Sequence, residues 1–169
     1  GKNRDIIAQA QSGTGKTGAF TVGMLELINI NKNKIQGIIL APTHELAEQI
    51  NEVVLKLGHY LEIKSLLLVG GTSVELNKKE LTNNTPHLIV GTPGRIHDMI
   101  RRKYLKVKDI KTLVIDEADE MLSSGFKEQM YKIFQYLNDD IQIGLFSATM
   151  PNELKELTKT FLQNPVKIL

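Results

Sequence analysis

The sequence predicts an α/β domain with a mainly parallel central sheet of about seven strands and helices on both faces. Short apolar runs rich in β-branched residues recur along the chain, and longer segments of helical period separate them. Several runs are apolar throughout, which is typical of strands that helices cover on both faces. The chain has 169 residues, 41% of them hydrophobic, so we expect one folded domain over residues 1–169.

The expected strands are short apolar runs bounded by polar or turn residues. The run at 37–41 reads Gly-Ile-Ile-Leu-Ala, and the run at 112–116 reads Thr-Leu-Val-Ile-Asp. Branched side chains of this kind pack well on a pleated sheet. In chain order, we expect strands at residues 5–8, 37–41, 64–69, 88–90, 112–116, 141–146 and 166–169.

Segments of helical period lie between these strands. In the last segment, Leu154, Leu157, Phe161 and Leu162 fall on one stripe, which predicts a helix that packs on the sheet. The expected helices are residues 16–30, 43–57, 74–81, 94–102, 125–137 and 152–162. Turn residues fill the connectors at 31–34, 83–86 and 138–140.

The composition excludes several classes of protein. There is no cysteine, so a disulfide framework and a thiolate metal site are excluded, and a cytoplasmic or nuclear location fits. No apolar run is long enough to span a membrane, and we expect no membrane association. The four histidines stand apart without the spacing of metal ligands, so we expect no structural metal. A net charge of +2 does not by itself indicate nucleic-acid binding, so that hypothesis depends on local motifs.

A glycine-rich segment joins the first expected strand to the first expected helix. Its residues are Ala10, Gln11, Ser12, Gly13, Thr14, Gly15, Lys16 and Thr17. In that context the backbone amides favour a phosphate, Lys16 can reach the β- and γ-phosphates, and the Thr17 hydroxyl can bind Mg²⁺. Ala10 stands where a glycine is usual, which indicates that this position needs no positive φ. The alternative is a glycine-rich turn with a surface lysine.

Two carboxylates follow the expected strand at 112–115. Asp116 can hold Mg²⁺, and Glu117 can orient and deprotonate a water molecule that attacks a phosphate. The alternative is a helix N-terminus, where acidic residues complement the helix dipole. Combined with Lys16 and Thr17, these carboxylates predict a Mg-nucleotide site. ATP is favoured over GTP because the Asn-Lys-Asn-Lys segment at 31–34 lacks the aspartate of a guanine-reading Asn-Lys-x-Asp motif.

These motifs resemble those of the DEAD-box RNA helicases, whose name spells residues 116–119. Further matches follow in family order: Pro-Thr-His-Glu-Leu at 42–46, Gly-Gly at 70–71, Thr-Pro-Gly-Arg at 92–95 and Ser-Ala-Thr at 147–149. Residues 116–129 look most like the translation initiation factor 4A branch. The resemblance implies a RecA-like P-loop fold, ATP and Mg²⁺ as cofactors, and ATP-dependent RNA helicase activity with Lys16, Asp116 and Glu117 as catalytic residues.

The resemblance also implies a grip on the backbone of single-stranded RNA or a short RNA duplex. The implied RNA-binding residues are Pro42, Thr43, His44, Gly70, Gly71, Thr92, Pro93, Gly94 and Arg95, and the implied coupling residues are Asp119, Ser147 and Thr149. Thr92 and Pro93 suit the start of a helix, yet Arg95 puts a cation near the positive end of its dipole, a conflict that an anion would resolve. The alternatives are plain helix capping and, for the glycine pair, a tight turn.

Some features depart from the family pattern. His44 stands where the family has arginine, so we expect a weaker or more pH-sensitive RNA contact. The family's adenine-reading motif and its second RecA-like domain, which supplies arginine fingers, lie outside this sequence. We therefore expect a monomer that hydrolyses little ATP alone and meets a scaffold or regulatory protein. An ATP-gated RNA clamp with suppressed turnover and another class of P-loop ATPase stay open as alternatives.

Overall fold

A computed structural model of the chain describes residues 4–11 and 15–168. Its described part forms one sheet of seven strands in the order β3-β4-β2-β5-β6-β1-β7, and every pairing is parallel. The strands are β1 (Ile6–Gln9), β2 (Gly37–Leu40), β3 (Ser65–Leu68), β4 (Leu88–Gly91), β5 (Thr112–Ile115), β6 (Gln142–Ser147) and β7 (Val166–Ile168). Because all strands run the same way, the loops that follow them meet at one edge of the sheet.

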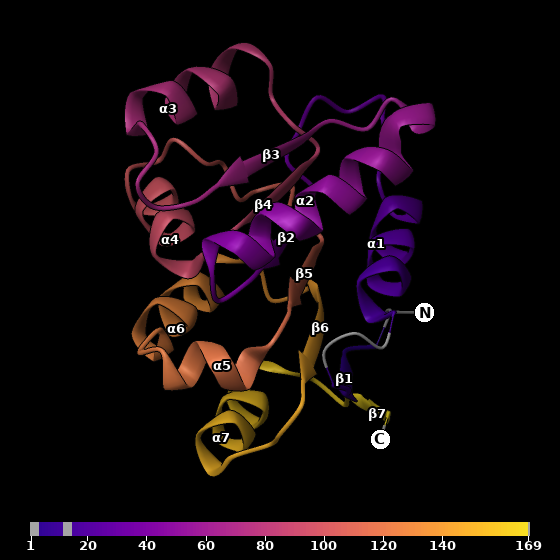
Figure 1. The fold of residues 1–169 in the computed structure, drawn as a ribbon, viewed down its shortest axis with the longest axis vertical. Helices are drawn as coiled ribbons and strands as arrows, with labels where there is room; N and C mark the ends of the chain where they lie inside the picture. The colour runs from indigo at the N-terminus through magenta and orange to yellow at the C-terminus, as the bar shows by residue number, and fades with distance from the viewer. Residues whose placement is uncertain (1–3, 12–14, 169) are drawn as a thin grey trace.

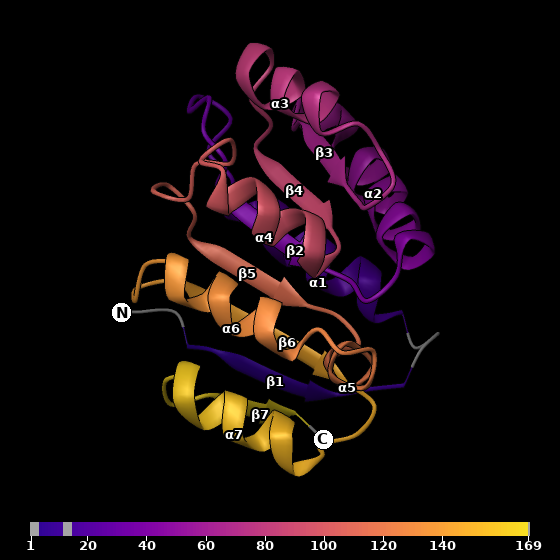
Figure 2. The same ribbon diagram turned by 90° about the vertical axis from the view of Figure 1, so that its left-hand side faces the viewer.

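Helices cover both faces of this sheet. Figures 1 and 2 show α4, α6 and α7 on one face and α1 and α2 on the other. The helices are α1 (Lys16–Glu26), α2 (His44–Gly58), α3 (Val74–Asn83), α4 (Pro93–Arg101), α5 (Ala118–Ser123), α6 (Lys127–Tyr136) and α7 (Asn152–Phe161), with a short 3₁₀ helix η1 (His59–Leu61) after α2.

Two apolar cores result, one on each face of the sheet. Successive residues of the central strand β2 point to opposite faces, as the strand period requires. Ile38 and Leu40 pack in the core beneath α4 to α7, whereas Ile39 packs in the core beneath α1 and α2. All three side chains are fully buried. The continuous apolar runs of the sequence are therefore explained by burial on both faces.

The α/β fold class with a parallel sheet is confirmed. Each of the seven expected strands is present, with ends that agree within one residue, except that residue 169 lies outside the described part of the chain. The six expected helices are also present. No helix among the described residues is long and apolar enough to cross a membrane.

Three helix boundaries differ from expectation by two residues or more, and two short helices, α5 and η1, are additional. Helix α3 runs to Asn83 and not to residue 81. Helix α1 ends at Glu26 and not at residue 30, because the Gln36 side chain bonds both the amide and the carbonyl of Asn29 and fixes this segment as a turn. Helix α6 starts at Lys127 and not at residue 125, since Gly125 has a φ of 85°. Helix α5 is not among the expected helices, although a helix N-terminus was the alternative interpretation of the acidic motif.

Candidate functional site

The predicted site residues gather where the chain leaves the parallel strands. The phosphate loop follows β1, the segments at 42–46 and 70–73 follow β2 and β3, and those at 92–95, 116–119 and 147–149 follow β4, β5 and β6. The strand ends are in register, because Leu40 of β2 lies beside both Gly91 of β4 and Ile115 of β5. The six motifs therefore share one edge of the sheet.

The phosphate loop leads directly into helix α1. Gly15 precedes the helix with a φ of 80°, a conformation that glycine adopts without steric cost, and Lys16 and Thr17 are the first helical residues. Ala10 is not among the residues of positive φ, so the expectation for this position is confirmed. Its amide donates to the Ser147 carbonyl at 3.0 Å. The predicted residues Ser12, Gly13 and Thr14 lie outside the described part of the chain.

Lys16 and Asp116 form a buried ion pair between the phosphate loop and the end of β5. Lys16 Nζ lies 2.6 Å from Asp116 Oδ1, and the two side chains are only 9% and 1% exposed. Burial raises the pKa of the Asp116 carboxyl, and the ion pair with Lys16 offsets only part of this effect. Asp116 Oδ2 is buried and has no hydrogen-bond partner among the described residues. One oxygen of this carboxylate thus remains able to accept a bond from a ligand or a water molecule.

This arrangement fits a Mg-nucleotide. Mg²⁺ keeps several water ligands and takes one or two protein oxygens together with phosphate oxygens. The described residues hold no group of three or more histidine, aspartate or glutamate side chains that could form an all-protein metal site. A single buried carboxylate beside a helix N-terminus is the donor set expected when phosphates supply the remaining ligands.

Glu117 has an unusual backbone conformation for its residue type. Its φ is 51° and its ψ is 53°, in the left-handed region that side chains other than glycine enter at a cost. Strained residues of this kind concentrate at functional sites. The residue also forms the N-cap of α5, so the strand-end interpretation and the helix-start alternative both describe this segment correctly.

Asp119 connects the acidic motif to the segment after β6. Its Oδ2 atom accepts hydrogen bonds from the Thr149 amide at 3.1 Å and the Thr149 hydroxyl at 2.8 Å. Its own amide donates to the Ser147 hydroxyl at 3.2 Å, and that hydroxyl donates to the Thr149 carbonyl at 2.7 Å. Burial alone would raise the pKa of Asp119, but the hydrogen bonds from Thr149, the nearby Ser147 hydroxyl and the Glu120 amide outweigh it and lower the pKa. The expected contact between the two motifs is therefore present.

Two helices of the predicted RNA site begin at this edge, and their N-termini are capped differently. Thr43 is the N-cap of α2, and its hydroxyl accepts the Leu46 amide at 3.1 Å. The exposed His44 follows as the first helical residue. Thr92 is the N-cap of α4 and Pro93 its first residue, but the Thr92 hydroxyl makes no capping bond. Capping thus explains Thr43 but not Thr92.

The glycine pair after β3 forms an open turn. Gly71 has a φ of 83°, and a Cβ atom added at Gly70 or Gly71 would meet nothing within 4 Å. The tight-turn interpretation is correct for the backbone. Both residues are exposed, with open space beside their Cα atoms.

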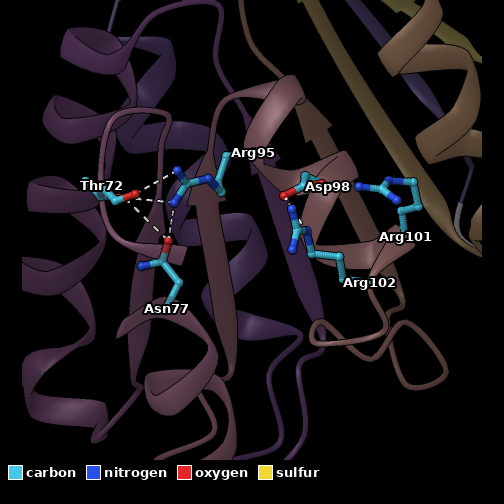
Figure 3. A network of polar contacts seen from close by, with 6 residues as sticks. All are labelled: Thr72, Asn77, Arg95, Asp98, Arg101 and Arg102. Atoms are coloured by element: carbon cyan, nitrogen blue, oxygen red, sulfur yellow. Dashed lines mark hydrogen bonds and ion pairs between the residues drawn. The ribbon is translucent and has the colours of Figure 1, made fainter. Parts of the chain in front are cut away.

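The Arg95 side chain points to oxygens of the neighbouring loop and helix (Figure 3). Its Nη1 donates to Asn77 Oδ1 at 2.7 Å and to Thr72 Oγ1 at 3.0 Å, and its Nη2 donates to the Thr72 carbonyl at 2.8 Å. None of these acceptors carries a formal charge, so an anion as a further partner of Arg95 stays a prediction. The sequence analysis did not identify Thr72 and Asn77. Asn77 lies four positions before Leu81, on the same face of α3, and both side chains are buried.

The basic segment that follows α4 is held apart from this network. Arg101 and Arg102 both pair with Asp98, at 2.7 and 2.9 Å. Figure 3 shows this cluster beside the bonds of Arg95. Because the two arginine side chains are 56% and 44% exposed, they are solvated residues at the end of α4.

The hollows of the surface do not by themselves mark the site. One of about 370 Å³ lies at the start of the phosphate loop, lined by Gln9, Ala10, Gln11 and Ala148. A larger one of about 690 Å³ lies at the opposite edge and includes Arg4, Lys111 and Asp140. It contains none of the predicted residues, so the motifs and their bonds identify the site better than cavity size does.

Comparison with known proteins agrees with this geometry. Residues 1–157 match the family model described as DEAD/DEAH box helicase. The chain is 51% identical over 168 residues to the ATP-dependent RNA helicase eIF4A of Pyricularia oryzae. The aligned region covers 99% of this chain and 42% of that helicase. The match extends over almost the whole chain, which includes all six motifs.

Solved structures show the same fold. A DEAD box protein from the hyperthermophile Methanococcus jannaschii matches 98% of this chain and 45% of its own at 40% identity, with a TM-score of 0.94. S. cerevisiae Dbp5 bound to RNA and ADP BeF3 matches 98% of this chain and 41% of its own at 38% identity, with a TM-score of 0.86. The fold is therefore RecA-like. The chain spans less than half the length of these relatives.

Proposed function

Because this chain belongs to the DEAD/DEAH box helicase family, we propose that it is the ATP-binding part of an ATP-dependent RNA helicase. The proposed activity is hydrolysis of ATP that is stimulated by RNA and coupled to local strand separation. The observation that carries this proposal is the buried contact of Lys16 with Asp116, at the same sheet edge as the three loops of the predicted RNA site.

In the proposed nucleotide site, each residue has one role. Lys16 turns from Asp116 to the β- and γ-phosphates, and the amides that follow Gly15 face the phosphates at the N-terminus of α1. The Thr17 hydroxyl and Asp116 hold Mg²⁺, which neutralises charge on the phosphates when bound. Glu117 orients the attacking water and takes its proton. The strained backbone of Glu117 supports this assignment.

The proposed RNA site lies beside the nucleotide site and reads only the backbone. The exposed turn at Gly70 and Gly71, the uncapped start of α4 and the first turn of α2 all present backbone amides at this edge. Amides and helix N-termini bind phosphate without reading bases. We therefore propose single-stranded RNA or a short RNA duplex as the ligand, with no preference for sequence in this part of the protein.

We further propose that efficient ATP hydrolysis requires parts of the full-length protein beyond this chain. Family relatives are more than twice as long, and an arginine finger from a second domain contributes orders of magnitude to turnover. The chain alone should then hydrolyse ATP very slowly. This function fits a monomeric protein of the cytoplasm or nucleus that binds a scaffold or regulatory protein.

The decisive test is ATP hydrolysis by the full-length protein with and without single-stranded RNA. We expect RNA to stimulate the wild type, and Glu117→Gln to lower turnover about a hundred-fold or more while ATP binding persists. Glu120→Gln makes the same charge change at an exposed position on α5 and should leave turnover unchanged. Hydrolysis that RNA does not stimulate would contradict the proposed function.

A further inference from the structure

Arg95 is held by three oxygens, and none of them carries a formal charge. Two belong to Thr72 and one is the side-chain oxygen of Asn77. The only carboxylate near it on α4, that of Asp98, is occupied by Arg101 and Arg102. Among the described residues, no aspartate or glutamate forms an ion pair with Arg95. The guanidinium is thus ordered, yet its positive charge is not neutralised.

The bonds around Thr72 fix the turn that contains the glycine pair. The Thr72 hydroxyl donates to the Val69 carbonyl at 2.8 Å, so its lone pairs are free to accept from Arg95. Arg95 also binds the Thr72 carbonyl at 2.8 Å. The turn is therefore tied at its start through Val69 and at its end through Thr72. Gly70 and Gly71 lie between these two points, and their backbone is exposed.

Asn77 is held in one orientation because its side chain bonds a donor on one side and an acceptor on the other. It is 4% exposed, its Oδ1 atom accepts from Arg95, and its Nδ2 atom donates to Glu80 Oε2 at 3.3 Å. A carboxylate at this position would keep the bond to Arg95 but add a negative charge at 2.7 Å from the guanidinium, which would neutralise it. The identity of residue 77 therefore sets the net charge of this part of the edge.

We propose that Asn77 is a positioning residue of the RNA site, whose neutral amide fixes Arg95 and the turn at Gly70 and Gly71 while leaving the Arg95 charge available to an RNA phosphate. This inference rests on the proposed function. Arg95 has two roles in it: its fork of donors orders the turn, and its charge attracts the RNA backbone. Asn and Asp have nearly the same shape, but Asp also loses the Nδ2 bond to Glu80 and faces that carboxylate. Asn77→Ala loses the same bond without adding a charge, so the two variants together separate charge from geometry.

The test is the salt dependence of RNA binding by the full-length protein, measured with a labelled uridine oligonucleotide, a non-hydrolysable ATP analogue and Mg²⁺. Asn77→Asp should weaken binding about five-fold and lower the slope of log affinity against log salt by about 0.7, the value for one phosphate contact with a single strand. Asn77→Ala should weaken binding with an unchanged slope, because it removes an anchor and no charge.

A matched control separates local from general charge effects. Asn51→Asp adds the same charge at another amide, whose oxygen accepts the Ser65 hydroxyl at the far end of β3. It should leave affinity and slope unchanged. If Asn77→Asp does not fold, Arg95→Lys and Arg95→Gln replace it: lysine should weaken binding with the slope retained, whereas glutamine should also lower the slope.

The outcomes distinguish this inference from the function on which it rests. If the wild type does not bind RNA with the ATP analogue, the proposed function fails. If it binds and Asn77→Asp keeps both its affinity and its salt slope, the role of Asn77 is wrong. An equal loss of slope in Asn51→Asp would likewise overturn it, because a general charge effect would then explain the result.

Discussion

Lys16 lies 2.6 Å from Asp116 in a contact that is almost sealed from solvent, and both residues are the ones proposed to serve ATP and Mg²⁺. The ion pair lets each charge compensate the other when no ligand is bound. When a Mg-nucleotide is bound, a phosphate would be the partner of Lys16 and Mg²⁺ the partner of Asp116, so each residue would keep a group of opposite charge beside it. ATP and Mg²⁺ should therefore bind better together than either does alone.

Removal of one member of this pair should destabilise the fold. Lys16→Ala leaves a buried, uncompensated carboxylate, and the loss of one partner of a buried ion pair typically costs about 3 kcal/mol of unfolding free energy. Burial already raises the pKa of Asp116, so this variant should unfold more readily as pH rises through the raised pKa. Urea unfolding at several pH values checks this, and Lys16→Ala combined with Asp116→Asn should recover stability.

The buried His87 should make stability depend on pH near neutrality. Burial and then the charge of Lys64 lower its pKa from the ordinary value of 6.5, and its Nδ1 atom accepts the Lys64 amide at 3.0 Å. Below pH 6.5 the unfolded chain takes up a proton that the folded chain refuses, so the unfolding free energy should fall as pH falls. His87→Gln should flatten this dependence in urea titrations.

His97 supplies a comparison for that experiment. Its pKa is also lowered, first by burial and then by Lys132 and Arg101, so His97→Gln should remove a separate share of the same dependence. If the urea midpoint of the wild type is the same at neutral pH and below pH 6.5, neither assignment holds.

Loss of the contacts between Asp119 and the segment after β6 should uncouple the two ligands. Ser147→Ala and Thr149→Ala remove hydroxyls that reach the acidic motif. We expect strand separation by the full-length protein to fall about ten-fold, with ATP affinity changed much less, since these hydroxyls bond neither Lys16 nor Asp116. Thr149→Ser keeps the hydroxyl and should retain activity. Undiminished unwinding by both alanine variants would contradict the coupling role.

Replacement of His44 by arginine should strengthen the RNA grip. The side chain is exposed on the first turn of α2, where an arginine would add a charge at all working pH values. We expect a few-fold higher RNA affinity and a salt slope that is steeper by about 0.7. His59→Arg adds the same charge just beyond the other end of α2 and serves as the control. Equal effects of the two variants would show only a general charge effect.

The sequence predicted best what depends on short, continuous runs. The strands β2, β4 and β5 are fully buried runs, and Lys16, Asp116 and Asp119 lie at the strand ends where the sequence predicted them. Helix α5 was missed because only Ala118 and Met121 of its six residues are buried, too few to show a helical period. A helix of only six residues is too short to show a clear period in a sequence.

The partners of Arg95 could not be predicted for a different reason. Thr72 and Asn77 lie 23 and 18 residues before it in the chain, and they meet it only because β3 and β4 are neighbours in the sheet. The sequence placed Arg95 near a helix N-terminus, from which we expected an anion to be its partner. A contact that depends on which strands pair is decided by the tertiary fold.

Ser147 contacts three segments at the carboxyl ends of the strands: the phosphate loop, the acidic motif and the segment after β6. Its carbonyl accepts the Ala10 amide at the start of the phosphate loop, and its hydroxyl lies between the Asp119 amide and the Thr149 carbonyl. The side chain is fully buried, so it cannot adjust by turning into solvent. The phosphate loop, the acidic motif and the segment after β6 are therefore joined through one residue that has no room to change its rotamer.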